Sequence, residues 1–259
     1  MTTSRLAMTA ILASLLFVSA PVFASGTDDS IEASAKQSYV FKTYLKGDDI
    51  TIQSREGVVT LAGTVAEESH KSLAQEYVAS LPGVKSVDNN LKEKGEIPAE
   101  HSDAWLIAKV KATLFFHRNV KATKTEVLAK NGTVTLRGKA SSMAQKDLTT
   151  EYAKDVEGVK IVKNEMKTSK AVLKPGETTM GEKMDAVSET IDDASVTALV
   201  RSTLLYHRST SALKTTVETK DGVVSLGGTA KNAAEKDLAT KLVSDVYGVN
   251  KVINNMTVK

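Results

Sequence analysis

Aromatic and basic residues stand together at two places in the chain, 90 positions apart. The first group is Phe115, Phe116, His117 and Arg118, preceded by Trp105, and the second is Tyr206, His207 and Arg208. Rings beside cationic side chains suit a membrane surface, where aromatic side chains lie at the level of the lipid headgroups. We therefore expect both groups and Trp105 to bind lipid. The alternative for each phenylalanine is that it completes the core of its own fold.

Histidine chemistry has few candidates. The chain has four histidines, His70, His101, His117 and His207, of which the last two occupy equivalent positions. A metal site needs several ligands that converge on one point, and this spacing does not supply them, so no metal is expected. The sequence favours surface residues at helix ends that interact with the helix dipole, with contact to an anion as the alternative.

Catalytic motifs are missing from the sequence. It contains no G-x-S-x-G, P-loop or dinucleotide fingerprint. Asp147 and Asp237 recur, but each follows a lysine on a predicted helix, as expected of a solvated face. We expect no enzyme activity, no cofactor and no small-molecule substrate.

Three similar segments account for most of the chain. The strings Gly57–Gly63, Gly132–Gly138 and Gly222–Gly228 share the pattern G-x-V-x-L-x-G and are offset by 75 and 90 positions. The same offsets relate further leucines, Gly-Val pairs and asparagines without a gap. We define module 1 as residues 29–92, module 2 as 104–167 and module 3 as 194–259. The segments 93–103 and 168–193 are predicted linkers, the second ending in a short amphipathic helix that includes Met180, Met184, Val187 and Ile191.

Each module is predicted to fold as helix, strand, strand, helix and strand. Apolar residues recur at i, i+4 and i+8 in each first helix; they are Ile31, Ala35 and Tyr39, then Leu106, Val110 and Leu114, then Val196, Val200 and Leu204. Capping boxes are expected at Ser142 with Gln145 and at Asn232 with Glu235. The fold class is therefore α+β, with three tandem modules that each pack two helices on a three-stranded sheet.

Glycines are expected to serve the hairpins. Asn131-Gly132 and Asp221-Gly222 suit a type I′ turn, which needs positive φ at both central residues. The predicted structural glycines are Gly57, Gly63, Gly132, Gly138, Gly222 and Gly228.

The first 24 residues predict a cleavable signal peptide. Arg5 precedes an apolar run from Leu6 to Val18, and Val22-Phe23-Ala24 offers a cleavage site. The alternative, a membrane anchor, needs about 20 apolar residues. The chain has no cysteine, so it offers no site for a lipoprotein anchor or a disulfide. With 34 basic and 31 acidic residues it lacks the excess of positive charge typical of nucleic-acid binding.

The repeated motifs resemble the BON domain of bacterial cell-envelope proteins. The resemblance rests on Asp192-Asp193 before Val196-Thr197, on Val200-Arg201 and Leu204, and on the G-x-V-x-L-x-G strings. In module 1, Ala35 departs from the pattern. The resemblance implies a periplasmic protein of the osmotic or envelope stress response that binds phospholipid.

Three functions follow as expectations. The first is docking on anionic phospholipid membranes, and the second is a periplasmic chaperone that holds unfolded proteins on exposed apolar surface. The third is a scaffold that binds other envelope proteins. Salt weakens the first and not the second.

Overall fold

The computed structural model describes residues 23–95, 98–168, 191–210 and 214–259. Module 1 has the predicted order of elements. They are α1 (Phe23–Gln37), β1 (Asp49–Arg55), β2 (Val58–Val65), α2 (Glu68–Ala79) and β3 (Ser86–Glu93), with a π-helix η1 (Val40–Tyr44) after α1. The predicted signal peptide up to residue 22 and most of the predicted linker helix lie outside the described residues.

Modules 2 and 3 repeat this order. Module 2 contains α3 (Asp103–Phe115), a 3₁₀ turn η2 (Ala122–Lys124), β4 (Thr125–Lys130), β5 (Thr133–Ala140), α4 (Met143–Lys154), β6 (Ile161–Asn164) and β7 (Lys167–Thr168). Module 3 contains α6 (Asp193–Tyr206), β8 (Lys214–Lys220), β9 (Val223–Ala230), α7 (Ala233–Ser244), β10 (Lys251–Asn254) and β11 (Thr257–Val258). The predicted α+β class with three repeated modules is confirmed.

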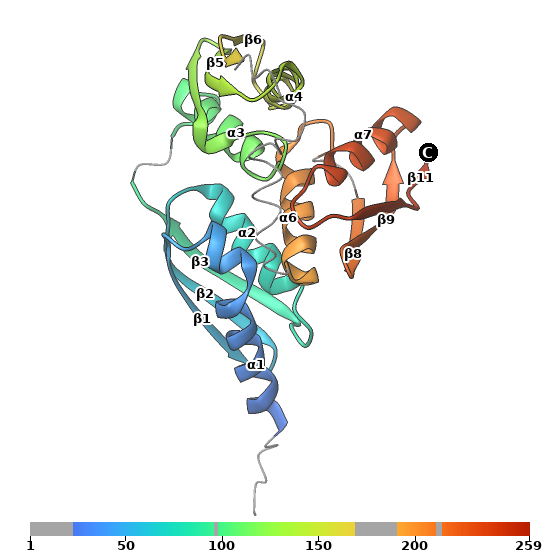
Figure 1. Ribbon diagram of the computed structural model, residues 1–259. Coiled ribbons are helices and arrows are strands. Elements are labelled where there is room, and N and C mark those ends of the chain that lie inside the picture. The colour runs from blue at the N-terminus through green and yellow to red at the C-terminus, as the bar shows by residue number, and fades with distance from the viewer. Residues whose placement is uncertain (1–22, 96–97, 169–190, 211–213) are drawn as a thin grey trace, which may run out of the picture.

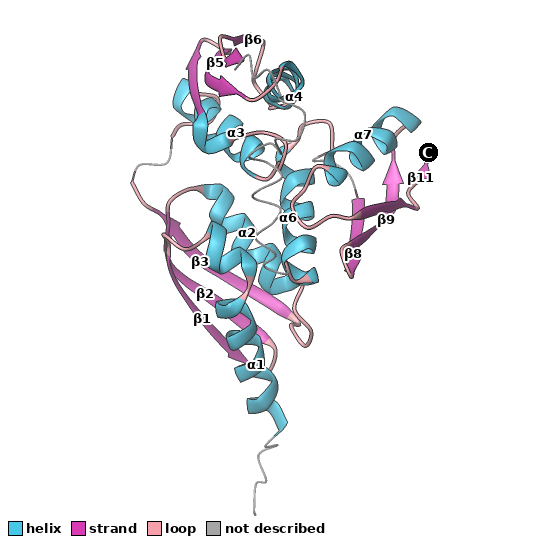
Figure 2. Cartoon of the chain, viewed as in Figure 1, coloured by secondary structure: helices cyan, strands magenta, loops and turns pink. Residues whose placement is uncertain are grey.

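The middle strand organises each sheet. It pairs antiparallel with the first strand and parallel with the third, as β5 does with β4 and β6. Alternate residues of β5 face the helices, and Val134 and Leu136 are both 0% exposed. The helices cover this inner face and leave the outer face of each sheet to solvent (Figure 2).

The third strand differs from the prediction in modules 2 and 3, where it is broken into two parts. In module 2 the Asn164 carboxamide oxygen accepts from the Met166 backbone N–H at 3.0 Å, and its nitrogen donates to the Lys146 carbonyl at 2.8 Å. This local turn lifts two residues out of the ladder and buries the Met166 side chain.

The hairpin turns are as predicted. Asn131 and Gly132 have φ of 51° and 82°, which is the type I′ conformation. Gly138, at the far end of the hairpin, has φ of +135°, and a Cβ there would collide with the Lys124 carbonyl oxygen. Glycine is therefore required at this position.

The capping residues are also as predicted. Ser142 Oγ accepts from the Gln145 N–H at 3.1 Å, and Asn232 Oδ1 accepts from the Glu235 N–H at 2.8 Å. In the reciprocal bonds, the backbone N–H of the residue before the cap, Ser141 or Lys231, donates to the side-chain oxygen of Gln145 or Glu235. The two second helices thus have their first free N–H groups satisfied.

The three modules pack together through helix α6. Figure 1 shows this helix in the middle of the molecule, beside α2 of module 1. Ala198 and Leu199 are 0% exposed and belong to a hydrophobic core that continues from module 3 into module 1. Module 2 has a core of its own, which also takes in Leu242 from α7.

Candidate functional site

The predicted aromatic and basic residues do not form one exposed surface. Trp105 is half-buried at the start of α3, where its ring lies 5.1 Å from that of His101 and 5.5 Å from the Lys109 amine. The same amine lies 5.1 Å from the Tyr206 ring. Trp105 therefore belongs to the helical side of module 2.

Phe115 and Phe116 pack against other modules. The Phe115 ring meets the Tyr44 ring of module 1 edge-on at 4.9 Å, and Phe116 is 0% exposed with its ring 5.9 Å from that of Tyr206. Phe116 joins the core that modules 1 and 3 share. The alternative that each phenylalanine completes its own module is therefore wrong for Phe116, because the end of α3 inserts into its neighbours.

His117 and His207 meet at the seam between modules 2 and 3. Their Nε2 atoms lie 2.8 Å apart, and the two residues are 1% and 0% exposed. The expectation that they lie on the surface at helix ends is wrong. They do follow the ends of α3 and α6, but both of these ends are covered by the opposite module.

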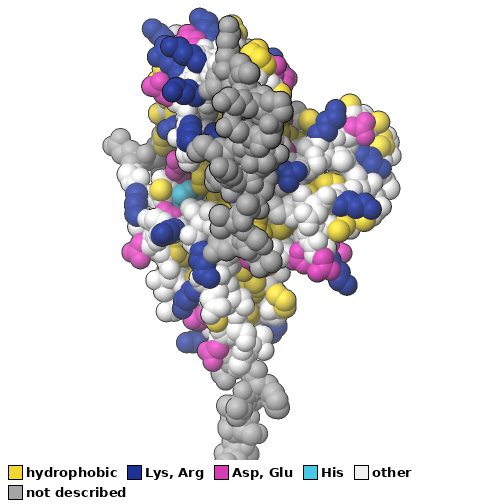
Figure 3. All heavy atoms as spheres, viewed as in Figure 1, with side chains coloured by type: hydrophobic (Ala, Val, Ile, Leu, Met, Phe, Trp, Pro, Cys, Tyr) yellow, Lys and Arg dark blue, Asp and Glu magenta, His cyan; other side chains and the backbone are white. Residues whose placement is uncertain are grey.

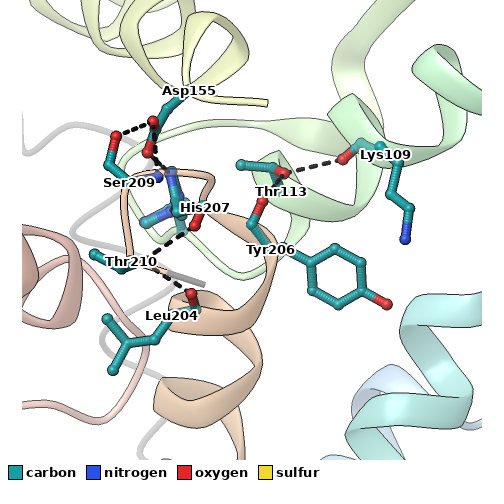
Figure 4. Close-up of polar contacts among 9 residues, drawn as sticks. Lys109, Thr113, Asp155, Leu204, Tyr206, His207, Ser209 and Thr210 are labelled. Carbon is teal, nitrogen blue, oxygen red and sulfur yellow. Dashed lines mark hydrogen bonds and ion pairs between the residues drawn. The ribbon is translucent and has the colours of Figure 1, made fainter. Parts of the chain in front are cut away.

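Two aspartates complete the seam with near twofold symmetry. His207 Nδ1 lies 3.0 Å from Asp155 Oδ2, and His117 Nδ1 lies 3.3 Å from Asp245 Oδ2. Asp155 ends α4 and Asp245 ends α7, at positions offset by the module repeat of 90. Figure 4 shows Asp155, His207 and Ser209 directed toward one another.

Backbone groups repeat the same symmetry. The Arg118 N–H donates to the Asp245 carbonyl at 2.9 Å, and the Arg208 N–H donates to the Asp155 carbonyl at 2.8 Å. The Asn119 side chain donates to the Asp245 carboxylate, and the Ser209 hydroxyl donates to that of Asp155. Each module therefore offers the other the same donors and acceptors, as in an isologous dimer interface.

The hydrogen bonds limit where the ring protons lie. The Asp155 carboxylate accepts, so His207 Nδ1 carries a proton. The contact between the rings needs one further proton, and when both rings are neutral this proton lies on His117 Nε2. His117 Nδ1 then carries no proton, and it makes no hydrogen bond in the described structure, although Asp245 Oδ2 lies 3.3 Å away.

Burial and hydrogen bonding set the ionisation of the cluster. Burial lowers the pKa of His117 below its usual range and outweighs the opposing effect of Asp245. Burial acts to raise the pKa of Asp155, but hydrogen bonds from His207 and Ser209 prevail, so that pKa lies below its ordinary value. A neutral His117 beside an ionised Asp155 agrees with the proton positions.

The two arginines remain at the surface. The Arg118 guanidinium donates to the Ser244 carbonyl at 2.9 Å and to the Val249 carbonyl at 3.3 Å, both in module 3. Arg208 is exposed beside a groove of about 390 Å³ between α4 and α7. Leu148, Tyr152, Leu238 and Leu242 form part of this groove, and Lys154 and Lys241 also line it.

Sequence reasoning missed the two aspartates of the seam. Asp155 and Asp245 recur in modules 2 and 3, whereas module 1 has Ser80 at the equivalent position and Lys42-Thr43 in place of His-Arg. A search for polar residues shared by two modules and absent from the third would have found all four members of the cluster. Such a search needs no knowledge of the fold.

An exposed basic surface lies on the outer face of the module 2 sheet. Its cations are Lys130, Arg137, Lys139, Lys163 and Lys167, and its anions are Glu126 and Glu165. Leu128 and Ile161 lie among them and are 37% and 56% exposed. We call these residues the basic sheet face. In Figure 3, Lys and Arg side chains gather at the upper end of the molecule, where module 2 lies.

Two negative findings apply to the described residues. None of their helices is long and apolar enough to cross a membrane. Within the same ranges, no three or more histidine, aspartate or glutamate side chains converge to hold a metal ion.

Comparison with known proteins gives one family. The model of the BON domain matches residues 27–95, 102–170 and 192–259. The osmotically-inducible protein Y of Escherichia coli is 31% identical over 201 residues, which is 78% of this chain and 93% of that protein.

Two other relatives match over less of this chain. The outer membrane lipoprotein DolP of Haemophilus influenzae is 28% identical over 52% of this chain and 71% of its own length. The 21 kDa hemolysin of Actinobacillus pleuropneumoniae is 33% identical over 44% of this chain and 60% of its own length. A solved C-terminal domain of CdsD, from the type III secretion system of Chlamydia trachomatis, covers 96% of this chain and 100% of that domain at 15% identity, but its TM-score is 0.22.

Proposed function

The chain belongs to the BON domain family, and we propose that it is a non-enzymatic periplasmic protein that docks on anionic phospholipid membranes during envelope stress. The similarity to an osmotically-inducible protein over most of both chains supports the stress role. The similarity to an outer membrane lipoprotein supports a place in the envelope. The predicted signal peptide agrees with export.

The observation that carries the docking proposal is the basic sheet face. Cross-strand pairing places Lys130, Thr133 and Ile161 in one row of the sheet. The next row is Leu128, Thr135 and Lys163. Each row thus joins one exposed apolar side chain to one lysine, with a threonine between them.

The charge of this face exceeds that of the module 1 face clearly and that of the module 3 face by one net charge. Module 1 has Arg55 and Lys92 against Asp49 and Asp88 on its outer sheet face, which is balanced. Module 3 has Lys214, Lys220 and Lys251 against Glu218. The basic sheet face has five cations against two anions, with Glu165 already bound by Arg137 at 2.7 Å.

The chemistry of this face fits an anionic bilayer. Each lysine or arginine close to an anionic membrane contributes about 1 kcal/mol, and this contribution falls off within a Debye length. Leu128 and Ile161 add apolar contact at the headgroup boundary. The fold holds these side chains on a rigid sheet, so docking needs no ordering of the chain.

Vesicle co-sedimentation of the full mature chain tests the proposal. We expect binding to vesicles that contain phosphatidylglycerol, little binding to pure phosphatidylcholine, and loss of most binding in about 0.5 M salt. The double variant Lys130→Glu, Lys163→Glu should weaken binding at least tenfold. The matched control, Lys214→Glu with Lys220→Glu on module 3, makes the same change in net charge and should weaken binding less.

Two outcomes oppose the proposal. Equal weakening by both double variants would mean that net charge, and not the basic sheet face, drives binding. Absence of vesicle binding together with salt-resistant suppression of client aggregation would favour the chaperone.

A further inference from the structure

His117 and His207 are ionisable, buried between two modules and unused by the basic sheet face. We propose that they form a proton-operated lock, which holds modules 2 and 3 together at neutral pH and releases them from each other in mildly acidic medium. The lock is the cluster of His117, His207, Asp155 and Asp245. The proposal does not depend on membrane docking.

In its neutral form the closed lock holds two ring protons. His207 Nδ1 donates to Asp155, and His117 Nε2 donates to His207 Nε2 at 2.8 Å. A third proton would have to enter at His117 Nδ1, which is buried and lies 3.3 Å from Asp245 Oδ2. An imidazolium there loses its hydration, and the contact with Asp245 does not offset that loss.

The carboxylate that faces this nitrogen, that of Asp245, already accepts hydrogen bonds from other donors. Asp245 Oδ2 accepts from the Tyr152 hydroxyl at 2.6 Å, and its other oxygen accepts from Asn119. The Tyr152 ring lies flat against the His117 ring, with centroids 3.8 Å apart. Asp245 thus lies 3.3 Å from His117 Nδ1 and is held there by other donors.

The remaining charged groups come from every element packed on the two rings. Asp155 ends α4, Arg118 follows α3, Arg208 follows α6, Asp245 ends α7, and Glu151, Lys154 and Lys241 line the adjoining groove. The Glu151 and Lys154 side chains bind each other at 2.8 Å, and the Arg118 guanidinium is bound to two carbonyls. In the described structure these three side chains therefore bond elsewhere and not to a histidine ring.

The sign of the pH effect follows from linkage. The closed seam holds the pKa of His117 below the ordinary value of 6.5, so the closed state binds fewer protons than the open state. Closure is therefore complete above pH 6.5 and weakens as the pH falls below it. For one proton, the ratio of open to closed seam rises by up to about tenfold for each pH unit in this window.

Release would uncover apolar surface. Phe116 crosses the seam into the core of modules 1 and 3, and Leu242 crosses it into the core of module 2. Both are at most 2% exposed in the closed form. The acid form would therefore present apolar contacts that the neutral form hides.

Module 1 provides an internal contrast. It has Lys42 and Ser80 where modules 2 and 3 have histidine and aspartate. Its own pair, His70 with Asp48 at 2.6 Å, lies within module 1, and the His70 ring stacks on Phe115 of module 2 and not on a second histidine. We therefore expect the contact between modules 1 and 3 to stay closed over the same pH range.

Nitrogen NMR of the histidine rings tests the proton positions in the full chain. At pH 7.5 we expect His207 as the Nδ1–H tautomer and His117 as the Nε2–H tautomer. On acidification His117 should stay neutral as the pH falls past 6.5, the ordinary value for histidine. Titration of His117 at or above pH 6.5 would overturn the lock.

Energy transfer between dyes tests release. Because the chain has no cysteine, Ala144→Cys and Ala234→Cys place two labels at equivalent exposed positions of α4 and α7. The fraction of open molecules should rise at least fivefold between pH 7.5 and 5.0. The same labels in His117→Gln should report no pH-dependent change, whereas His70→Gln should behave like the parent chain. A seam that stays closed after NMR shows His117 charged would also overturn the lock, even if His117→Gln fails to fold.

Discussion

The Tyr152 hydroxyl of module 2 donates a 2.6 Å hydrogen bond to Asp245 of module 3. This bond breaks the symmetry of the seam, because the residue of module 3 equivalent to Tyr152 is Leu242. Burial raises the pKa of the Tyr152 hydroxyl and nearby Asp245 raises it further, so the hydroxyl stays protonated as the donor. The two halves of the seam are therefore similar but not identical. Tyr152 of module 2 both binds Asp245 and stacks on His117, and module 3 has a leucine in its place.

The variant Tyr152→Phe should destabilise the chain. It removes one donor from a buried carboxylate but keeps the ring stack on His117, so we expect a loss of about 1–3 kcal/mol. Urea unfolding measures this loss. The control is Tyr206→Phe, whose hydroxyl makes only a 3.4 Å bond to Ser72, and its loss should be smaller. Equal stability of Tyr152→Phe and the parent would show that the bond contributes nothing.

The variant Gly138→Ala should destabilise module 2. The backbone has φ of +135°, and the new Cβ would press on the Lys124 carbonyl. We expect a cost of at least about 1–3 kcal/mol. Gly47→Ala is the matched control, since a Cβ at Gly47 meets no atom within 4 Å. Thermal unfolding that is the same for both variants would mean that the hairpin relaxes without strain.

Asp28 should make module 1 sensitive to acid. Its carboxylate accepts from Ser54 Oγ at 2.6 Å and from the N–H groups of Glu56 and Gly57 at 2.7 and 3.0 Å. These bonds, led by that from Ser54, lower its pKa below the ordinary value of 3.8. Stability from Asp28 is therefore complete well above pH 3.8 and is lost as the pH falls through the lowered value.

Comparison of urea midpoints for the parent and Asp28→Asn checks this sign. At pH 7 the variant should unfold at lower urea. The difference should shrink as the pH falls from about 4 toward 2. A difference that grows in acid would contradict the assignment.

Trp105 should not respond to vesicles. It is the sole tryptophan, and it lies on the helical side of module 2, whereas the basic sheet face is on the other side. Its emission should therefore stay within a few nanometres of the value in buffer when anionic vesicles are added. A clear blue shift would return the docking surface to the end of α3, as the sequence first suggested.

Local structure could be predicted because neighbouring residues determine it. The Asn131-Gly132 turn, the Ser142 cap and the alternation of Val134 and Leu136 all follow from short-range backbone chemistry. These signals recur in other modules, which strengthens each of them.

The packing of one module on another could not be predicted in the same way. Phe116 and His117 follow an amphipathic helix and are polar or aromatic, so the local pattern places them at a surface. Their burial depends on α6, which begins at Asp193, and on α7, which begins at Ala233, so both helices lie far away along the chain. The basic sheet face could not be predicted without the strand register, because only the pairing of β5 with β4 and β6 brings Ile161 into one row with Lys130 and Thr133.

The central claim is that the outer sheet face of module 2 meets the membrane, and a polarity-sensitive dye at Ile161→Cys tests it most directly. The controls are Ile253→Cys on module 3 and Trp105→Cys on the helical side of module 2. Each variant carries a single label because the chain has no cysteine of its own. With phosphatidylglycerol vesicles the dye at position 161 should shift to the blue, with little change at the other two. A blue shift at 105 or 253 without one at 161 would contradict the account.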